Sequence, residues 1–322
     1  MIEIKKFTET DTEFQEICRV ENLIRFDSVA IPEEKKRWWQ KRNKEKTFRK
    51  LLLYCDNNFI GVIHYCKGIK ENQQNCYFSI YLDPQYQNDN FYETLYNAML
   101  EDIRQFKCNK LFPYVFEHPN YKRYEAFLLK KDFKVVQINR EYSLNIEDVE
   151  LENYFPLINK LESKGIKIYD SKYEMQDFPN HYQKLEELEW IYSKDIPRPE
   201  GIAHTRDLFE EFMKELKDFY KYSYGVDLVA VKDNQYIGGT YLEINQGTPT
   251  TAWTGSLGVL RDFRRQGIAT ALKIKAIDIL KERGIKDIRT DNEKNNPMYK
   301  INVALGFKPV PFCIDYMKEF YE

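Results

Sequence analysis

The hydrophobic pattern of the chain is clearest near its C-terminal end. Apolar residues at helical spacing predict one face of a helix, and these are Ile268, Leu272, Ala276 and Ile279. Gly284 predicts the end of this helix. An apolar run at residues 255–259 predicts a strand before it, and residues 285–289 predict a short strand after it. A second helix is expected to open at Asn295-Asn296-Pro297-Met298 and to close in Leu305-Gly306-Phe307.

A second pattern is an internal repeat. The hexapeptide at residues 56–61, Asp-Asn-Asn-Phe-Ile-Gly, recurs at residues 233–238 as Asp-Asn-Gln-Tyr-Ile-Gly, an offset of 233 − 56 = 177. In each copy an Asp-Asn turn joins two apolar runs, which predicts a β-hairpin. The same offset matches the helix predicted at 91–106 with the one at 268–283. Leu129–Phe133 then takes the place of the later Leu-Gly-Phe turn.

The repeat predicts two tandem domains, one at residues 1–150 and one at residues 160–322, joined near residues 147–160. A chain of 322 residues is long enough for two domains.

The loop before the C-terminal helix carries the most specific chemistry. It reads Arg264-Arg265-Gln266-Gly267-Ile268-Ala269. Its glycine allows a tight backbone turn, and the free N–H groups of the helix start would converge on an anion together with the helix dipole. Two arginines add positive charge and forked donors. The spacing matches neither a P-loop nor a dinucleotide fingerprint, so we expect a different kind of phosphate or pyrophosphate site.

The Arg-x-x-Gly-x-Ala loop, the strand before it and the later Asn-x-Pro-Met and Leu-Gly-Phe motifs resemble the GNAT superfamily of N-acetyltransferases over residues 165–322. The resemblance implies an α+β fold in which each domain has a mostly antiparallel central sheet flanked by helices. It also implies acetyl-CoA as co-substrate and direct attack of a primary amine on the thioester, without a covalent enzyme intermediate. The tandem arrangement is similar to that of mycothiol synthase-like proteins.

The same resemblance assigns the cofactor-binding residues. The main chain of Leu257, Gly258 and Val259 is expected to meet the pantetheine arm and the thioester, in a gap where this strand diverges from its neighbour. A backbone N–H near Leu257 or Val259 would then stabilise the oxyanion. The remaining cofactor-binding residues implied by the resemblance are Arg264, Arg265, Gln266, Gly267, Ile268, Ala269, Thr270 and Asn295.

The N-terminal copy of this loop lacks the glycine and the two arginines that predict phosphate binding in the C-terminal copy. It reads Gln87-Asn88-Asp89-Asn90-Phe91-Tyr92, with neither glycine nor arginine, and with an aspartate that would repel an anion. We therefore expect the N-terminal domain to be degenerate and to have lost cofactor binding, leaving it a structural or substrate-shaping role.

The acid and base of the reaction are less clearly indicated. Many GNAT enzymes carry a tyrosine acid four residues before the glycine of Leu-Gly-Phe, where this chain has Asn302. Either Tyr299 or Tyr316 replaces it, or the CoA thiolate leaves unaided, since a thiol of pKa about 8.5 is a tolerable leaving group. For the base, Glu243 and Asp195 are candidates, although surface or capping roles are commoner for such carboxylates. Histidine side chains in general titrate near neutral pH, which makes His204 a further candidate, but it is expected on a loop surface.

The amino-acid composition of the chain limits the kinds of partner and cofactor that we expect it to bind. With 49 basic and 51 acidic residues, the net charge of −2 offers no bulk attraction to nucleic acid. No apolar stretch approaches the length of a membrane span. Six scattered cysteines are typical of the reducing cytoplasm, and four isolated histidines give no metal-binding spacing, so no metal is expected.

The amine acceptor is left open by the sequence, as is the oligomeric state. Helices are predicted at about 177–194 and 205–222, on either side of a segment that resembles the cleft lining of tandem GNAT proteins. Glu186, Glu187 and Glu189 on the first would attract a cationic amine or simply form its solvated face. A small-molecule amine, an antibiotic and a peptide amine all fit. A non-catalytic acyl-CoA sensor is the alternative; an aminoacyl transferase using charged RNA ranks last, because the neutral chain offers no RNA surface.

Overall fold

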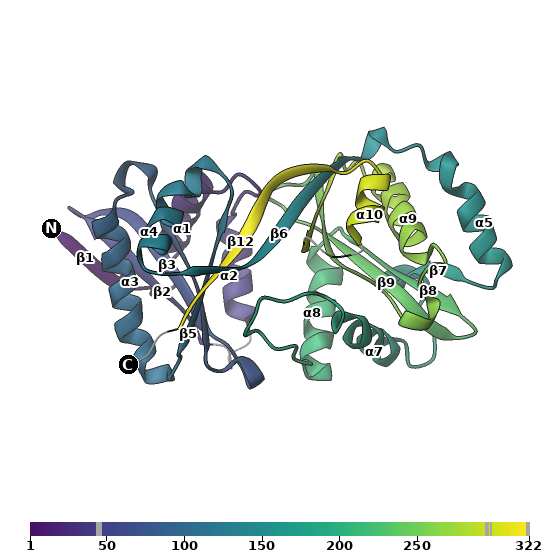
Figure 1. The fold of residues 1–322 in the computed structure, drawn as a ribbon, viewed down its shortest axis with the longest axis horizontal. Coiled ribbons are helices and arrows are strands. Elements are labelled where there is room, and N and C mark those ends of the chain that lie inside the picture. Colours follow the sequence, from purple (N-terminus) through teal and green to yellow (C-terminus); the bar gives the residue numbers. More distant parts are fainter. Residues whose placement is uncertain (43–46, 294–295, 297, 320–322) are drawn as a thin grey trace. The chain divides into compact units, whose positions relative to one another are not determined.

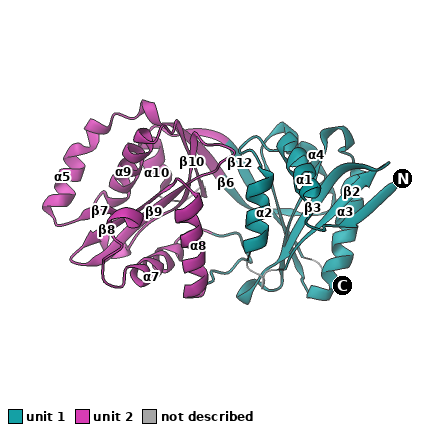
Figure 2. Ribbon diagram, turned by 180° about the vertical axis from the view of Figure 1, so that it is seen from behind, with its two compact units in different colours: residues 1–139, 198–205, 311–322 teal, residues 140–197, 206–310 magenta. Residues whose placement is uncertain are grey.

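The computed structural model describes residues 1–42, 47–293, 296 and 298–319, and it divides into two compact units (Figures 1 and 2). Unit 1 comprises residues 1–139, 198–205 and 311–322, and unit 2 comprises residues 140–197 and 206–310. No helix in the described part of the chain is long and apolar enough to cross a membrane.

Unit 1 is an α+β unit built on a sheet with the strand order β1-β2-β3-β4-β5-β12. Its strands are β1 (Ile2–Lys6), β2 (Phe48–Cys55), β3 (Asn58–Lys67), β4 (Asn75–Leu82), β5 (Lys110–Phe116) and the later part of β12 (Lys308–Glu319). Its helices are α1 (Asp11–Ile24), α2 (Pro32–Lys41), α3 (Asp89–Ile103) and α4 (Lys122–Lys130). The side chains between sheet and helices form one apolar core, to which β12 contributes Ile314 and Tyr316.

Unit 2 repeats this plan with the strand order β6-β11-β10-β9-β8-β7. Its strands are β7 (Lys167–Asp170), β8 (Val226–Lys232), β9 (Gln235–Ile244), β10 (Thr251–Val259), β11 (Asp287–Glu293) and the later part of β6 (Lys134–Asn145). Its helices are α5 (Phe155–Ser163), α6 (Ser171–Glu174), α7 (His181–Ser193), α8 (Phe209–Tyr222), α9 (Ile268–Glu282) and α10 (Met298–Ala304).

The strand registers confirm the repeat. Leu53 and Ala230 stand at the same irregularity of the β2–β3 and β8–β9 ladders, and 230 − 53 = 177. The hairpin turns also agree, because both residues of each Asp-Asn turn have positive φ, 48° and 65° in one copy and 50° and 61° in the other. Such φ values are those of the tight hairpin turns that suit twisted strands. The neighbours β4–β5 and β10–β11 run parallel, while the other pairs described here run antiparallel, so the predicted fold class is confirmed.

The two units exchange their last strands. Residues 134–139 of β6 belong to unit 1 and residues 140–145 to unit 2, while β12 passes from unit 2 into unit 1 at residue 311. Each unit is therefore built from several separate segments of the chain, whereas the sequence repeat suggests a single boundary near residues 147–160. The assignment of a degenerate N-terminal domain and an acyl-CoA-binding C-terminal domain stays a prediction.

Helices α7 and α9 cover opposite faces of the unit 2 sheet. A Cβ atom on Gly239 of β9 would lie 3.3 Å from Leu188 of α7, and one on its neighbour Gly238 would lie 3.4 Å from Ile268 of α9. Successive side chains of a strand point to opposite faces, so the two helices lie on different sides. We call these two faces of the unit 2 sheet the α7 side and the α9 side.

Candidate active site

Strand β10 diverges from one of its two neighbours. It pairs with β9 from Ala252 to Val259, but with β11 only from Thr251 to Trp253. Within the described residues, the backbone of 254–259 therefore has no strand partner on the β11 side. Unpaired strand backbone offers N–H and C=O groups to any extended ligand laid beside it. Leu257, Gly258 and Val259, the residues expected to meet the pantetheine arm, lie in this stretch.

A β-bulge interrupts β10 just where it diverges. The register with β9 shifts by one residue between Thr254 and Ser256, which leaves Gly255 as the extra residue. A Cβ atom on Gly255 would lie 1.9 Å from the ring of Tyr241, so only glycine allows this ring to cover the strand. The equivalent ladder between β3 and β4 shows no such shift. Bulges of this kind redirect backbone groups next to functional sites.

A tyrosine of α7 covers the diverging stretch of β10. The Tyr192 hydroxyl lies 2.8 Å from Oγ of Ser256. A Cβ atom on Gly258 would lie 2.1 Å from Cγ of Tyr192, so the ring rests directly on the backbone. The Tyr192 side chain is 5% exposed and thereby fixes the α7 side of the residues proposed to meet the thioester.

Gly258→Ala is expected to destabilise the protein by about 2 kcal/mol, because an added methyl group in a filled site forces Tyr192 or the strand to move. Gly239→Ala is the control, since its Cβ atom would lie 3.3 Å from Leu188 and needs only a small shift of that side chain. Urea unfolding of both variants measures the difference. Equal free energies of unfolding for the two would show that Tyr192 does not rest on the β10 backbone.

The loop after β10 forms an open helix N-terminus. Gly267 is the N-cap of α9 with φ 89°, and no side chain of the described residues caps the first turn. Arg265 also has a positive φ, 63°, so the chain turns twice within three residues. Alternating turns of this sort gather backbone N–H groups into an anion-binding concavity. A Cβ atom on Gly267 would lie 2.5 Å from Leu157, which gives a second reason for glycine at this position.

Asp195 is bound to the arginines at this loop. Its carboxylate accepts hydrogen bonds from Arg261 and Arg264, and the Nε of Arg264 also donates to the Val259 carbonyl at 2.8 Å. The bonds from Arg261 and Arg264 lower the pKa of Asp195 to about 2. A carboxylate of such low pKa is a weak base at neutral pH. Asp195 is therefore better suited to holding the arginines beside the loop than to accepting a proton.

An acidic cavity of about 120 Å³ lies on the α7 side of the sheet. Its walls come from α7, α8, β8 and β9, and its lining residues are Glu189, Phe212, Glu215, Leu216, Phe219, Asp227, Tyr241 and Glu243. Tyr241 links it to β10, because its ring packs over Gly255. Four carboxylates and a wall of aromatic rings form a site suited to a cationic group on an organic molecule.

Three of the four carboxyl groups that line this cavity have raised pKa values. Burial, together with Asp227, Glu186 and Glu215, raises the pKa of Glu189 to about 8. Burial raises the pKa of Asp227 to about 6 against the bond donated by Tyr220, and burial and Glu215 raise the pKa of Glu243. Crowded, partly buried carboxyls of near-neutral pKa are typical of sites that exchange protons with a substrate.

Comparisons with known proteins agree with this geometry. Residues 185–303 match the family model described as "Acetyltransferase (GNAT) family". This segment of the chain is therefore similar to a GNAT acetyltransferase domain. A curated relative of this GNAT domain, N-alpha-acetyltransferase 30 of Schizosaccharomyces pombe, is 24% identical over 120 residues, which are 37% of this chain and 73% of the relative. The predicted family and the prediction of an N-acetyltransferase are thereby confirmed at the level of the family.

Solved structures share the fold of this chain along nearly its whole length. A tandem GNAT protein from the clavulanic acid biosynthesis pathway is 14% identical with a TM-score of 0.76, covering 99% of this chain and 98% of its own. A GCN5-related N-acetyltransferase from Sphaerobacter thermophilus is 14% identical with a TM-score of 0.69, covering 99% and 95%. At such identities the likeness concerns the fold alone.

The remaining predicted site residues of the GNAT domain are less well placed for chemistry. Tyr299 on α10 is 40% exposed, with its ring 5.7 Å from that of Tyr142. Asn302 is fully buried and donates to Asn292, so it is a core residue of unit 2. Asn295 lies outside the described residues.

Two other titratable groups from the sequence analysis belong to unit 1. Tyr316 is 2% exposed and donates to Glu125 at 2.7 Å, and His204 accepts from Nε of Arg198 at 3.1 Å. A tyrosine buried in this way is not free to protonate a leaving group. The sequence predicts Glu243 as a candidate base, whereas it predicts Glu189 only as one of several acidic residues on a helix. Two of the carboxylates that raise the pKa of Glu189 come from segments distant in the sequence, which is why the sequence does not indicate its role.

Proposed function

We propose that unit 2 transfers an acetyl group from acetyl-CoA to a primary amine by direct attack, and that the acceptor enters through the acidic cavity. The observation that carries this proposal is the meeting of two features on β10. The strand diverges from β11 at Trp253, and the uncapped N-terminus of α9 follows eight residues after Val259, at Gly267. Together they supply an extended backbone edge for an acyl-pantetheine arm and a nest of N–H groups for its pyrophosphate.

The loop residues have distinct parts in binding. The amides of residues 265–270 hold the pyrophosphate, and the exposed side chains of Arg264 and Arg265 add charge around it. Asp195 keeps Arg261 and Arg264 beside the loop through its paired hydrogen bonds. Gln266, Ile268, Ala269 and Thr270 complete the turn, and Asn295 is proposed to contact the cofactor arm.

Acetyl-CoA supplies a thioester, an acyl group already activated toward amines. The unpaired β10 backbone at Leu257, Gly258 and Val259 orients this group and offers an N–H to the carbonyl oxygen as negative charge develops there. Tyr192 closes the α7 side of the strand and excludes water from it. The enzyme's contribution is thus mainly positioning and stabilisation of charge.

Glu189 takes up the proton that the ammonium form of the acceptor loses. A general base works best when its pKa lies near the working pH, and Glu189, with a pKa raised to about 8, meets this condition. Glu243 stands on β9 opposite Trp253 of β10 and contributes negative charge that attracts the cationic amine. Tyr299 remains a candidate for the acid; without it the CoA thiolate leaves unaided.

The lining of the acidic cavity indicates the chemical class of the amine acceptor. The acidic lining of the cavity favours a cation, and the aromatic rings Phe212, Phe219 and Tyr241 favour an organic amine over an inorganic ion. Both a small-molecule amine and the α-amine of a peptide meet these requirements, and the likeness to N-alpha-acetyltransferase 30 supports the second. We place the reaction in the cytoplasm, where a reducing environment would keep the six cysteines of the chain as thiols.

The release of free CoA thiol tests this function. Wild-type protein with acetyl-CoA is offered a panel of polyamines, aryl-alkyl amines, aminosugars and short peptides with free N-termini, alongside the same compounds acetylated on nitrogen. Thiol release is expected with at least one free amine and not with its acetylated partner. Tight acetyl-CoA binding without amine-dependent release across the panel would instead favour the acyl-CoA sensor.

A further inference from the structure

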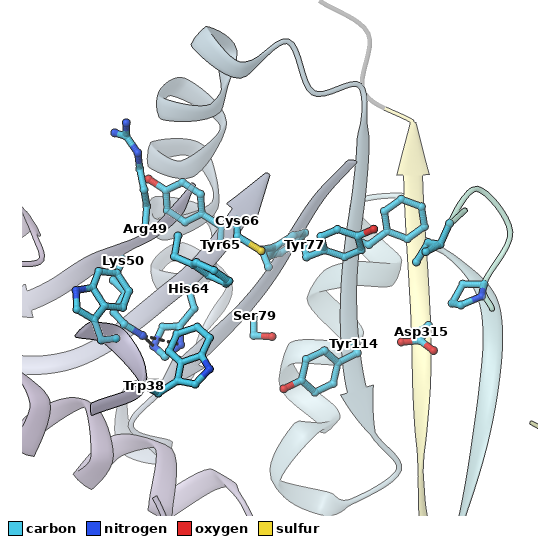
Figure 3. Close-up of a pocket in the computed structure, with 16 residues that line it drawn as sticks. Trp38, Arg49, Lys50, His64, Tyr65, Cys66, Tyr77, Ser79, Tyr114 and Asp315 are labelled. Carbon is cyan, nitrogen blue, oxygen red and sulfur yellow. Dashed lines mark hydrogen bonds between the residues drawn. The ribbon is translucent and has the colours of Figure 1, made fainter. Parts of the chain in front are cut away.

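Unit 1 contains a cavity of about 370 Å³ that the proposed reaction does not use (Figure 3). Its walls are mainly aromatic and include Trp38, Trp39, Phe48, Tyr77, Phe112 and Tyr114. The rings of Tyr77 and Phe112 lie nearly parallel, 5.6 Å apart at 30°, and provide a flat face. All its lining residues belong to unit 1, so the cavity is complete within that unit.

This cavity occupies the place that the acidic cavity occupies in unit 2. Three residues stand side by side on β2, β3 and β4, with Lys50 opposite His64 and His64 opposite Ser79. The repeat offset of 177 converts this row into Asp227, Tyr241 and Ser256, which are likewise opposite one another on β8, β9 and β10. Cys66 similarly corresponds to Glu243. The repeat has thus kept the cavity and reversed its charge.

The polar groups at the Lys50 end of the cavity are mostly donors. The Lys50 ammonium group lies 3.2 Å and 3.4 Å from the two ring nitrogens of His64, its only hydrogen-bond partners within the described part of the chain. The indole Nε1 of Trp39, in a side chain 5% exposed, has no acceptor there. Buried donors without acceptors are costly, and a ligand acceptor would satisfy them.

The nearby charges leave this end positive. The buried carboxylate of Glu21 is paired with Lys35 at 2.6 Å and lies 3.4 Å from Nε2 of His64. Its attraction for the Lys50 ammonium group is outweighed by burial and by the positive charge of Lys35. Burial and the positive charge of Lys35 lower the pKa of Lys50 to about 7. A bound anion would reverse this shift by stabilising the ammonium form.

We propose that this cavity of unit 1 binds a small, flat organic carboxylate. Its carboxylate lies between Lys50, His64 and the Trp39 indole, and its apolar part lies between the aromatic walls. Arg49 takes no part, because it is paired with Asp102 at 3.1 Å. Asp315 lines the cavity from β12, away from Lys50, and accepts a hydrogen bond from Asn139 at 2.7 Å (Figure 3). It restricts the anionic end of the ligand to the Lys50 side.

This site is separate from the proposed acetyl transfer and does not depend on it. The loop that would hold a pyrophosphate in unit 1 reads Gln87–Tyr92, with an exposed Asp89 in its centre. A CoA ester would therefore lack its main anchor there, whereas a small carboxylate needs only the cavity. Because binding to unit 1 is measured without acetyl-CoA, its failure leaves the proposed function untouched.

Calorimetry with phenylacetate as probe, and phenylacetamide as its uncharged analogue, tests the site on the full chain. Phenylacetate is expected to bind once per chain with a Kd below about 1 mM, and the amide at least about tenfold more weakly. Lys50→Met should raise the Kd for phenylacetate at least about tenfold, because it removes the charge and keeps the volume. Lys122→Met, which removes an exposed lysine of unit 1, should leave it unchanged.

Three results would overturn the proposal: no saturable binding of phenylacetate, equal binding of acid and amide, or unchanged binding by folded Lys50→Met. The second would mean a purely apolar pocket. Should Lys50→Met not fold, Ser79→Trp, which fills the cavity beside His64, must abolish binding instead. Retained binding by that variant would place the ligand elsewhere.

Discussion

Gly267→Glu is expected to weaken acetyl-CoA binding by at least about 100-fold, which corresponds to about 2.7 kcal/mol. The glycine caps α9 with φ 89°, a backbone conformation that a residue with a Cβ atom adopts only under strain. Its Cβ atom would also lie 2.5 Å from Leu157. In addition, the carboxylate would compete with the pyrophosphate for the helix N-terminus. Calorimetric titration with acetyl-CoA measures the loss.

The repeat offers a matched control for this variant. Asn90 holds the position of Gly267 in unit 1, since 267 − 90 = 177, and it is exposed at the start of α3. Asn90→Glu adds the same side chain and should leave acetyl-CoA affinity unchanged. Near-UV circular dichroism of both variants verifies that each is folded. Loss of affinity in Asn90→Glu, or its retention in folded Gly267→Glu, would contradict the assignment of the pyrophosphate site to unit 2.

Glu189→Gln is expected to lower kcat/KM for the amine acceptor by about 100-fold, the usual contribution of a positioned base. The base must be unprotonated to act, and the pKa of Glu189 is raised to about 8. In wild-type protein kcat/KM should therefore rise with pH up to about 8 and level off above it. The variant should lose this rise while keeping its affinity for acetyl-CoA. Initial rates of thiol release between pH 6 and 10 would measure both effects.

Two further variants make this result specific. Glu243→Gln removes charge from the same cavity and is expected to raise KM more than it lowers kcat, because its proposed part is attraction of the amine. Glu282→Gln removes an exposed carboxylate of unit 2 and should change neither value. A pH profile of Glu189→Gln that keeps the wild-type inflection would assign the proton to another group.

The local elements of this fold could be predicted from the sequence. The two Asp-Asn hairpins, the strand at 255–259 and the helix of α9 are all present within a few residues of their predicted limits. Each depends on short-range features, namely the positive φ tolerated by Asp and Asn, apolar periodicity and a glycine at the N-cap. The repeat offset fixed the correspondence between the units for the same reason, since equal turns and strand lengths give equal registers.

The features that sequence analysis missed arise from long-range contacts. The pKa of Glu189 is raised first by burial and then by charges that include Asp227 and Glu215, which are 38 and 26 positions away in the chain. The arginine partners of Asp195 are 66 and 69 residues away. The bulge at Gly255 and the exchange of β6 and β12 between the units depend on strand pairing, which periodicity does not encode. In unit 1, the reversal of cavity charge becomes visible only when Lys50, His64 and Ser79 are seen in one row.

The most direct test of the central claim is backbone hydrogen exchange, measured by mass spectrometry with and without acetyl-CoA. With acetyl-CoA bound, slower exchange is expected in two segments of unit 2, the β10 stretch 257–259 and the loop and helix start 265–270, with unit 1 unchanged at residues 87–92. Protection confined to the unit 1 loop, or protection absent from both unit 2 segments under saturating acetyl-CoA, would contradict the central claim.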